Sequence, residues 1–164
     1  MDGTKKWEKT ASLDIAEDSI SSCIKMEYPS GLTPVHFLRL TLTHNGDPVS
    51  LNTYMRSCEE NDYRAIRALP KVKLEAATRA EREGDHWRFT TKVRNVSSHP
   101  ALMVRLKAVR EKSGDRILPV FYADNYLTLM AGELRTTQTE LYHADTRGEN
   151  PKIVVEGFNV GEVA

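Results

Sequence analysis

Residues 87–96 have the sequence WRFTTKVRNV, in which apolar and polar side chains alternate. Successive side chains of a β-strand point to opposite faces of a sheet, so Trp87, Phe89 and Val93 share one face. Residues 71–76 (KVKLEA) alternate in the same way, and a Gly-Asp turn at 84–85 lies between the two stretches. This pattern predicts an antiparallel hairpin with one buried face.

Further extended segments follow the hairpin and are separated by residues that favour turns. They cover residues 102–109, 118–122, 126–130, 133–142 and 153–158. About seven short strands, with turns roughly 8–12 residues apart, are typical of an immunoglobulin-like sandwich. We therefore expect an all-β fold in which residues 71–164 form an immunoglobulin-like antiparallel β-sandwich.

The chain upstream of the sandwich has a similar pattern but too few strands to close a sandwich of its own. Residues 23–28, 35–44 and 49–55 favour strands, so residues 1–60 are interpreted as a partial β-sheet domain, the C-terminal remnant of a preceding β-sandwich domain. Residues 61–70 are interpreted as a linker with a short helix that Pro70 ends. An open sheet exposes pairing edges, so we expect a homodimer through residues 1–60, or poor solubility.

The length and charge of the chain exclude several classes of protein. Its 164 residues fit one domain, or one domain and a fraction, and its 23 Lys+Arg balance 23 Asp+Glu to give zero net charge. A neutral chain offers no broad basic field for nucleic acid. No apolar run approaches the roughly 18 residues of a membrane span, and the polar start lacks the apolar core of a secretory signal. We expect neither a nucleic-acid nor a membrane partner.

Residues for catalysis or metal binding do not occur in the patterns that such chemistry needs. The five histidines are scattered, and the two cysteines, Cys23 and Cys58, lack metal-site spacing. Both are interpreted as core thiols, although spacing alone leaves a disulfide between them open. The sequence contains no Gly-x-Ser-x-Gly elbow and no phosphate-binding glycine loop. We expect no catalytic residue, no metal site and no cofactor.

The densest group of functional-looking residues lies within 119–129, where Tyr122, Asp124, Asn125 and Tyr126 occur together. The tyrosines could stack on a sugar ring while the carboxylate and the amide bind its hydroxyls. Alternatively, Asp-Asn is a favoured turn pair, and the flanking aromatic rings fill the core. These four residues are the candidate carbohydrate contacts.

Several short motifs occur in an order that resembles one known module. They are LPKVKL (69–74), VRNV (93–96), LPVFYADNY (118–126), Gly132-Glu133 and Gly157-Phe158-Asn159. Together they resemble the C-terminal immunoglobulin-like domain of family-two glycoside hydrolases of the exo-β-glucosaminidase and β-mannosidase type. The resemblance covers about residues 68–160. Residues 49–54 (VSLNTY) are similar to the end of the domain that precedes it in those enzymes, except that Met55 stands where a second aromatic residue is common.

The resemblance implies a parent that hydrolyses terminal β-linked mannosyl or glucosaminyl residues with retention, without a metal cofactor. Its catalytic glutamates would lie on a (β/α)8 barrel that this chain lacks, so no acidic residue here inherits a catalytic role. The chain is interpreted as a non-catalytic module that packs on the rest of the parent, which we expect to be periplasmic or secreted in a bacterium. The alternatives are a carbohydrate-binding module and a free-standing immunoglobulin-like interaction domain.

Overall fold

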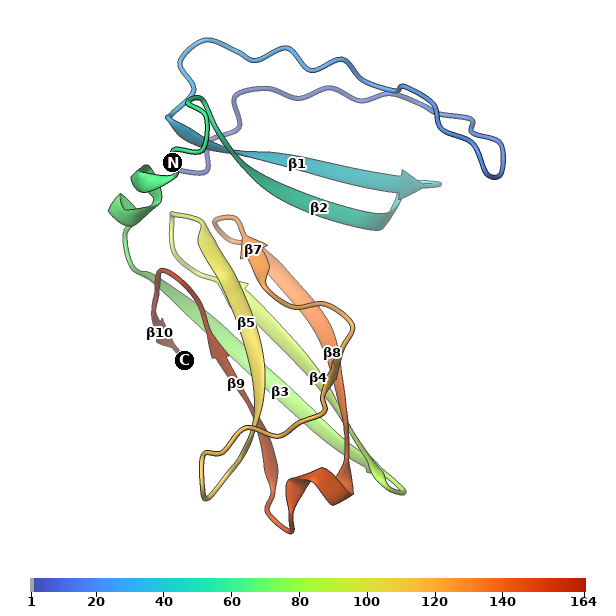
Figure 1. The fold of residues 1–164 in the computed structure, drawn as a ribbon, viewed down its shortest axis with the longest axis vertical. Coiled ribbons are helices and arrows are strands. Elements are labelled where there is room, and N and C mark those ends of the chain that lie inside the picture. Colours follow the sequence, from blue (N-terminus) through green and yellow to red (C-terminus); the bar gives the residue numbers. More distant parts are fainter. Residues whose placement is uncertain (1) are drawn as a thin grey trace. The chain divides into compact units, whose positions relative to one another are not determined.

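The computed structural model describes residues 2–164 and divides the chain into two compact units, Gly3–Ala68 and Leu69–Ala164. Met1, the first residue of the predicted remnant, lies outside the described residues. Within residues 2–164, the helices are two 3-10 turns, η1 (Arg64–Ala68) and η2 (His143–Thr146), and all other regular elements are strands (Figure 1). The predicted all-β fold is confirmed.

The first unit contains one antiparallel hairpin. Strand β1 (Val35–His44) pairs with β2 (Asp47–Ser57), with Phe37 opposite Met55. Asn45 and Gly46 connect them with φ values of 52° and 89°. Positive φ at both central residues is the requirement of a type I′ turn, whose twist matches that of the two strands. The Asn-Gly dipeptide therefore determines the hairpin.

The strand predicted for residues 23–28 is absent, so this prediction was wrong. No strand lies in residues 2–34, although Ile24 and Met26 are half buried while their neighbours are exposed. Alternation arranges side chains, but a strand also needs a neighbour that bonds to its backbone, and this segment has none.

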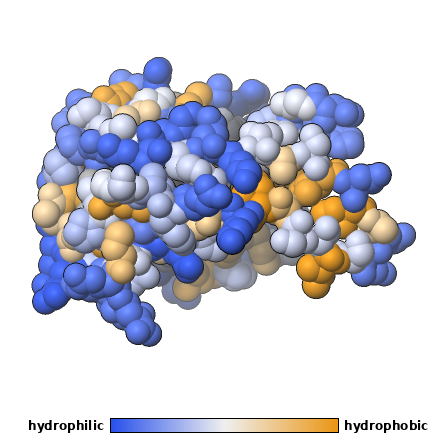
Figure 2. All heavy atoms as spheres, turned by 90° about the horizontal axis from the view of Figure 1, so that it is seen from above, coloured by the Kyte–Doolittle hydropathy of each residue, from blue (hydrophilic) through white to orange (hydrophobic). Residues whose placement is uncertain are grey.

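Several apolar side chains of the hairpin remain at the surface. Leu40 and Leu42 are 49% and 55% exposed, and Val49 and Tyr54 are exposed as well. Figure 2 shows hydrophobic residues at the surface among hydrophilic ones on one face of the molecule. Two strands offer one layer only, and a sheet buries its apolar face only against a second layer.

The second unit is a sandwich of two sheets. The sheet with strand order β10-β3-β4-β8-β6 faces a sheet with order β7-β5-β9 (Figure 1). The strands are β3 (Val72–Glu83), β4 (His86–Asn95), β5 (Ala101–Arg110), β6 (Phe121–Tyr122), β7 (Leu127–Leu129), β8 (Leu134–Tyr142), β9 (Pro151–Glu156) and β10 (Val160–Val163). The predicted immunoglobulin-like sandwich is confirmed.

Strand β10 departs from the predicted pattern. It pairs in parallel with β3, Val160 lying opposite Val72 and Val163 opposite Leu74, whereas the neighbouring pairs of this sheet are antiparallel. The sequence pattern did not indicate it, because four residues that include Gly161 are too short to show a period. The strand extends the five-stranded sheet beyond β3.

The core of the sandwich lies on the face that the alternation in β4 predicted. Phe89, Thr91 and Val93 are almost completely buried, and Leu106 of β5 is buried in the facing sheet. Trp87 is half buried and stacks on Phe89 at 6.1 Å between ring centroids. Burying side chains of this size stabilises the fold by about 1.5–3 kcal/mol each.

Two buried asparagines join segments at the end of the sandwich where β4 ends and β5 begins. Asn95 Nδ2 donates to the carbonyls of His99 (2.8 Å) and Leu129 (3.0 Å). Asn159 Nδ2 donates to the carbonyls of Pro70 (3.0 Å) and Pro100 (2.9 Å), and its Oδ1 accepts from Leu102 N–H at 2.9 Å. Buried polar groups stabilise only when their hydrogen bonds are made, so these residues fix the loops that they join.

Candidate functional site

Tyr122, the first predicted sugar contact, lies in β6 and packs against the core. Its side chain is half buried and contacts the cluster that contains Leu106 and Val104. Its hydroxyl lies 3.4 Å from the backbone N–H of Ala108, which donates to it. The structure therefore places this ring inside the sandwich rather than at its surface.

Asn125 lies between β6 and β7 and binds the backbone of β5. Its Nδ2 donates to the carbonyl of Leu106 at 3.1 Å, and its Oδ1 accepts from the N–H of the same residue at 2.8 Å. The side-chain amide thus bonds to β5 as the backbone of a neighbouring strand would. Strand β7 itself pairs with β5 only through Ala101 and Val104 of β5. These side-chain bonds of Asn125 are all made to the protein backbone.

Asp124 stabilises the same turn. Its Oδ1 accepts from the N–H of Asn125 at 2.8 Å, and its carbonyl accepts from the hydroxyl of Thr137 at 3.0 Å. A carboxylate that bonds to the following backbone N–H is a common way to hold a tight turn. Its side chain remains exposed, so one oxygen stays accessible to solvent.

Tyr126 is exposed, at 63%. It has a φ of 56°, a left-handed conformation that is uncommon for an aromatic residue and costs of order 1–3 kcal/mol. Its N–H donates to Asn125 Oδ1 at 2.9 Å, which holds the turn. Hydrogen bonding to the Tyr126 hydroxyl is the largest of the causes that raise the pKa of Arg105 above its usual value.

An ion-pair group lies beside Tyr126 on the three-stranded sheet. Arg105 of β5 lies opposite Glu156 of β9 and pairs with it, and Lys107 Nζ lies 2.6 Å from the same carboxylate. The bond from Lys107, followed by that from Arg105, lowers the pKa of Glu156 below its usual value. This carboxylate is therefore held ionised by two cations of the neighbouring strand.

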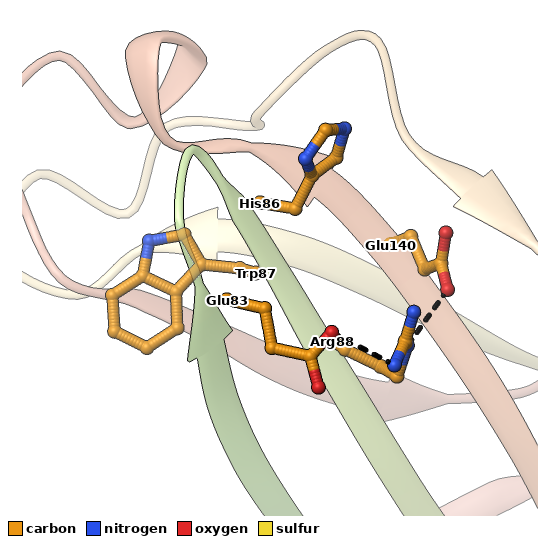
Figure 3. A pocket seen from close by; sticks show the side chains of 5 residues that line it. All are labelled: Glu83, His86, Trp87, Arg88 and Glu140. Carbon is orange, nitrogen blue, oxygen red and sulfur yellow. Dashed lines mark hydrogen bonds and ion pairs between the residues drawn. The ribbon is translucent and has the colours of Figure 1, made fainter.

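A second group of polar and aromatic side chains lines a hollow at the turn between β3 and β4. The hollow has a volume of about 190 Å³, and Figure 3 shows the side chains that line it. These are Glu83, His86, Trp87, Arg88 and Glu140.

Arg88 occupies the middle of this group. Its guanidinium donates to Glu140 Oε1 through Nε at 2.9 Å and to Glu83 Oε2 at 3.1 Å, as the dashed lines in Figure 3 indicate. These two carboxylates, Glu140 first, raise the pKa of Arg88. The sequence pattern predicted only the Gly-Asp turn here, because the contribution of Glu140 depends on the pairing of β8 with β4.

Neither cysteine is buried or part of a disulfide. Cys23 and Cys58 are free and exposed, so the predicted core thiols are wrong. Cys58 lies at the end of β2 in a two-stranded sheet that has no covering layer, and Cys23 lies in the segment without strands. Within residues 2–164, no cluster of three or more potential metal ligands occurs, and no helix has the length and hydropathy to cross a membrane.

Comparison with known proteins matches residues 52–160 to the family model described as the exo-beta-D-glucosaminidase Ig-fold domain. An exo-beta-D-glucosaminidase from Streptomyces avermitilis is 30% identical over 98% of the chain and 20% of its own length. One from Amycolatopsis orientalis is 26% identical over 98% of the chain and 18% of its own length.

A solved structure agrees with these matches. The crystal structure of an exo-chitosanase from Amycolatopsis orientalis has a TM-score of 0.75 and 26% identity, over 80% of this chain and 18% of that chain. The chain therefore spans about a fifth of the length of the curated relatives that it matches. The similarity extends over both units of the chain, since it covers almost all residues.

Proposed function

The chain belongs to the Ig-fold domain family of exo-beta-D-glucosaminidases, and from this premise we propose that it is a non-catalytic module of a family-two glycoside hydrolase. The proposed parent removes terminal β-linked glucosaminyl residues with retention, through two carboxylates on a catalytic barrel. A β-mannosidase parent is the alternative within the same type of enzyme. The module packs on the remainder of the parent and supports it.

The roles of the asparagines in the shared motifs carry this proposal. Asn95, Asn125 and Asn159 all bond through their side-chain amides to backbone groups of other segments. Gly157 belongs to the same set, because a Cβ atom there would lie 2.6 Å from Val160 Cγ2 and 3.1 Å from Leu102 O. Residues that hold a fold together are what a supporting module requires.

The carboxylates of the sandwich support a structural role as well. A retaining glycosidase needs two carboxyl groups roughly 5–5.5 Å apart that face each other across the substrate. Glu133 instead accepts from Arg135 (2.8 Å) and from the N–H of Met130 (2.9 Å), and Glu149 accepts from the N–H groups of Lys112 and Ser113. Together with Glu156, they stabilise loops and strands of their own unit.

Turnover by the purified chain tests the non-catalytic part of the proposal. Residues 1–164 are incubated with p-nitrophenyl β-D-glucosaminide and p-nitrophenyl β-D-mannoside, and the exo-beta-D-glucosaminidase from Streptomyces avermitilis serves as the positive control. We expect no release of p-nitrophenol above a heat-killed sample. Turnover that persists through repeated purification would refute a non-catalytic role.

Carbohydrate binding by the predicted residues Tyr122, Asp124, Asn125 and Tyr126 is a second candidate function, favoured by the exposure of Tyr126. Its exposed ring is available to stack on a sugar. Titration calorimetry with mannan and chitosan oligosaccharides tests it. Heat that disappears in Tyr126→Ala supports the function, and the absence of heat at millimolar ligand rejects it.

A further inference from the structure

The outer face of the five-stranded sheet carries two rows of cross-strand neighbours close to the β6 edge. In one row, Phe121 lies opposite Glu140, and Glu140 lies opposite Arg88. In the other row, Tyr142 lies opposite His86. Directly opposite residues of a sheet share a face, and so do residues two apart in one strand, so the two rows form one surface.

Aromatic rings form one part of this surface. Tyr142 lies 4.4 Å from His86 and 6.5 Å from Phe121, measured between ring centroids. Phe121 and Tyr142 are 57% and 41% exposed. Exposed aromatic side chains that cluster beside polar groups mark binding surfaces, because their apolar faces gain free energy when a ligand covers them.

Charged groups form the other part. On the outer face, the carboxylates of Glu83 and Glu140 meet the single guanidinium of Arg88, which leaves an excess of one negative charge. Arg88 bonds to one oxygen of each carboxylate, Oε2 of Glu83 and Oε1 of Glu140. The second oxygen of each can accept a hydrogen bond from a ligand.

We propose that this surface binds a pyranose ring that carries an ammonium group, the glucosamine residue of a β-linked chain. The sugar ring stacks on Tyr142 and contacts the nearly perpendicular ring of Phe121 at its edge, and its ammonium group and hydroxyls donate to Glu140 and Glu83. An ammonium group is also attracted by the face of an aromatic ring. The choice of an amino sugar rests on the local negative charge and on the proposed function.

The size of the hollow limits the ligand. Pockets for drug-sized ligands have volumes of roughly 300–1,000 Å³, whereas the hollow beside Arg88 has about 190 Å³. The hollow therefore accommodates no more than one sugar residue, whose ring contacts Tyr142 beside the hollow, and the neighbouring rings of the chain extend over the open face of the sheet. This surface is distinct from the Tyr126 turn, which borders the three-stranded sheet.

Amide NMR of the full chain tests the proposal, with the fully deacetylated glucosamine trimer and its N-acetylated counterpart as probes. The titration is run near pH 6, so that the amino group of the sugar carries a proton. A comparable α-amino group has a pKa of roughly 7.7–8.0. We expect shifts in residues 83–88, 121 and 139–142 with the deacetylated trimer. Tyr142→Ala should weaken binding roughly tenfold. Glu140→Gln should weaken binding of the deacetylated trimer only.

Phe158→Ala is the matched control, because it removes another exposed aromatic ring, 43% exposed, outside this surface. It should leave the affinities for the deacetylated trimer and for the N-acetylated trimer unchanged. Dispersed amide spectra verify that every variant is folded. No shifts up to about 10 mM trimer, or equal affinity in Tyr142→Ala and the unmodified chain, would overturn the proposal. Binding that disappears in Tyr126→Ala but persists in Tyr142→Ala overturns it too. The hydrolysis assay does not depend on Tyr142, so the proposed function is judged separately.

Discussion

Asn125 binds both backbone groups of Leu106, donating from Nδ2 to the carbonyl and accepting at Oδ1 from the N–H group. This contact joins the turn after β6 to the middle of β5. The first prediction concerns its loss. Asn125→Ala leaves the N–H and carbonyl of Leu106 without these partners, and a single unsatisfied buried group costs about 1–3 kcal/mol. We expect a lower midpoint of urea denaturation with an unchanged slope.

Gln138→Ala is the control for this measurement, because Gln138 is exposed on the outer face of β8. Its free energy of unfolding should change by no more than an ordinary surface substitution causes, about 0.5 kcal/mol. An Asn125→Ala midpoint equal to that of the unmodified chain would show that the contact does not stabilise the fold.

The close approach of Gly157 to β5 leads to a second prediction. In Gly157→Ala, the new Cβ meets Val160 Cγ2 at 2.6 Å and the backbone oxygen of Leu102 at 3.1 Å. The backbone oxygen cannot move aside readily, so overpacking should lower the free energy of unfolding by about 1–3 kcal/mol.

Gly161→Ala provides the comparison, since its Cβ would lie 3.2 Å from Cβ of the exposed Lys71 side chain. We expect it to be nearly neutral, within about 0.5 kcal/mol. Equal losses of thermal stability in the two variants would contradict the role given to the contact with Leu102.

The pKa of Glu156 leads to a third prediction, on pH. Lys107 and Arg105 lower this pKa in the folded chain, so the ionised carboxylate stabilises the fold above the unfolded value of about 4.3. The stabilisation disappears as the pH falls through the lower, folded value. The stability difference between the unmodified chain and Glu156→Gln should therefore be full near pH 7 and decrease as the pH falls from the unfolded pKa of about 4.3 through the lower, folded pKa.

Urea denaturation at several pH values measures this difference, and Glu75→Gln on the exposed side of β3 is the control. A Glu156→Gln difference that stays constant from neutral to acidic pH would disprove the coupling to Lys107 and Arg105.

The open edges of the β1–β2 sheet lead to a fourth prediction. A two-stranded sheet exposes one unpaired edge on each strand, and Leu42 adds an apolar side chain that is 55% exposed. We expect light scattering to detect a dimer whose fraction increases with concentration. Leu42→Lys should shift the chain toward monomer, whereas Leu118→Lys, at a position in the other unit that is also exposed, should not. A monomer mass at every concentration would reject edge pairing.

The sandwich could be predicted because alternation in β4 records which side chains face the core. Phe89 and Val93 are buried as their positions required, and the Asn-Gly pair at 45–46 forms the turn that joins β1 to β2. The sequence did not reveal that residues 23–28 lack a pairing partner, since alternation describes one strand and not its neighbour. The short strand β10 was not predicted, because its four residues are too few to show the two-residue alternation of a strand.

The site was harder to predict than the fold. The group 122–126 attracted attention because of its residue types, yet the amide of Asn125 is bonded to β5 and the ring of Tyr122 packs in the core. The surface around Tyr142 is assembled from β3, β4, β6 and β8, so only the register of these strands brings Phe121 and His86 to it. Strand pairing determines which residues adjoin one another across a sheet, and the residue types alone do not reveal that pairing.

A chimera tests the central claim most directly. Residues 1–164 replace the matching segment of the Streptomyces avermitilis exo-beta-D-glucosaminidase, and hydrolysis of p-nitrophenyl β-D-glucosaminide is compared with that of the enzyme from which the segment is deleted. If the chain is a supporting module of such an enzyme, the chimera should be soluble and active, while the deleted enzyme is inactive or unstable. A chimera that folds no better and turns over no faster than the deleted enzyme would contradict the claim.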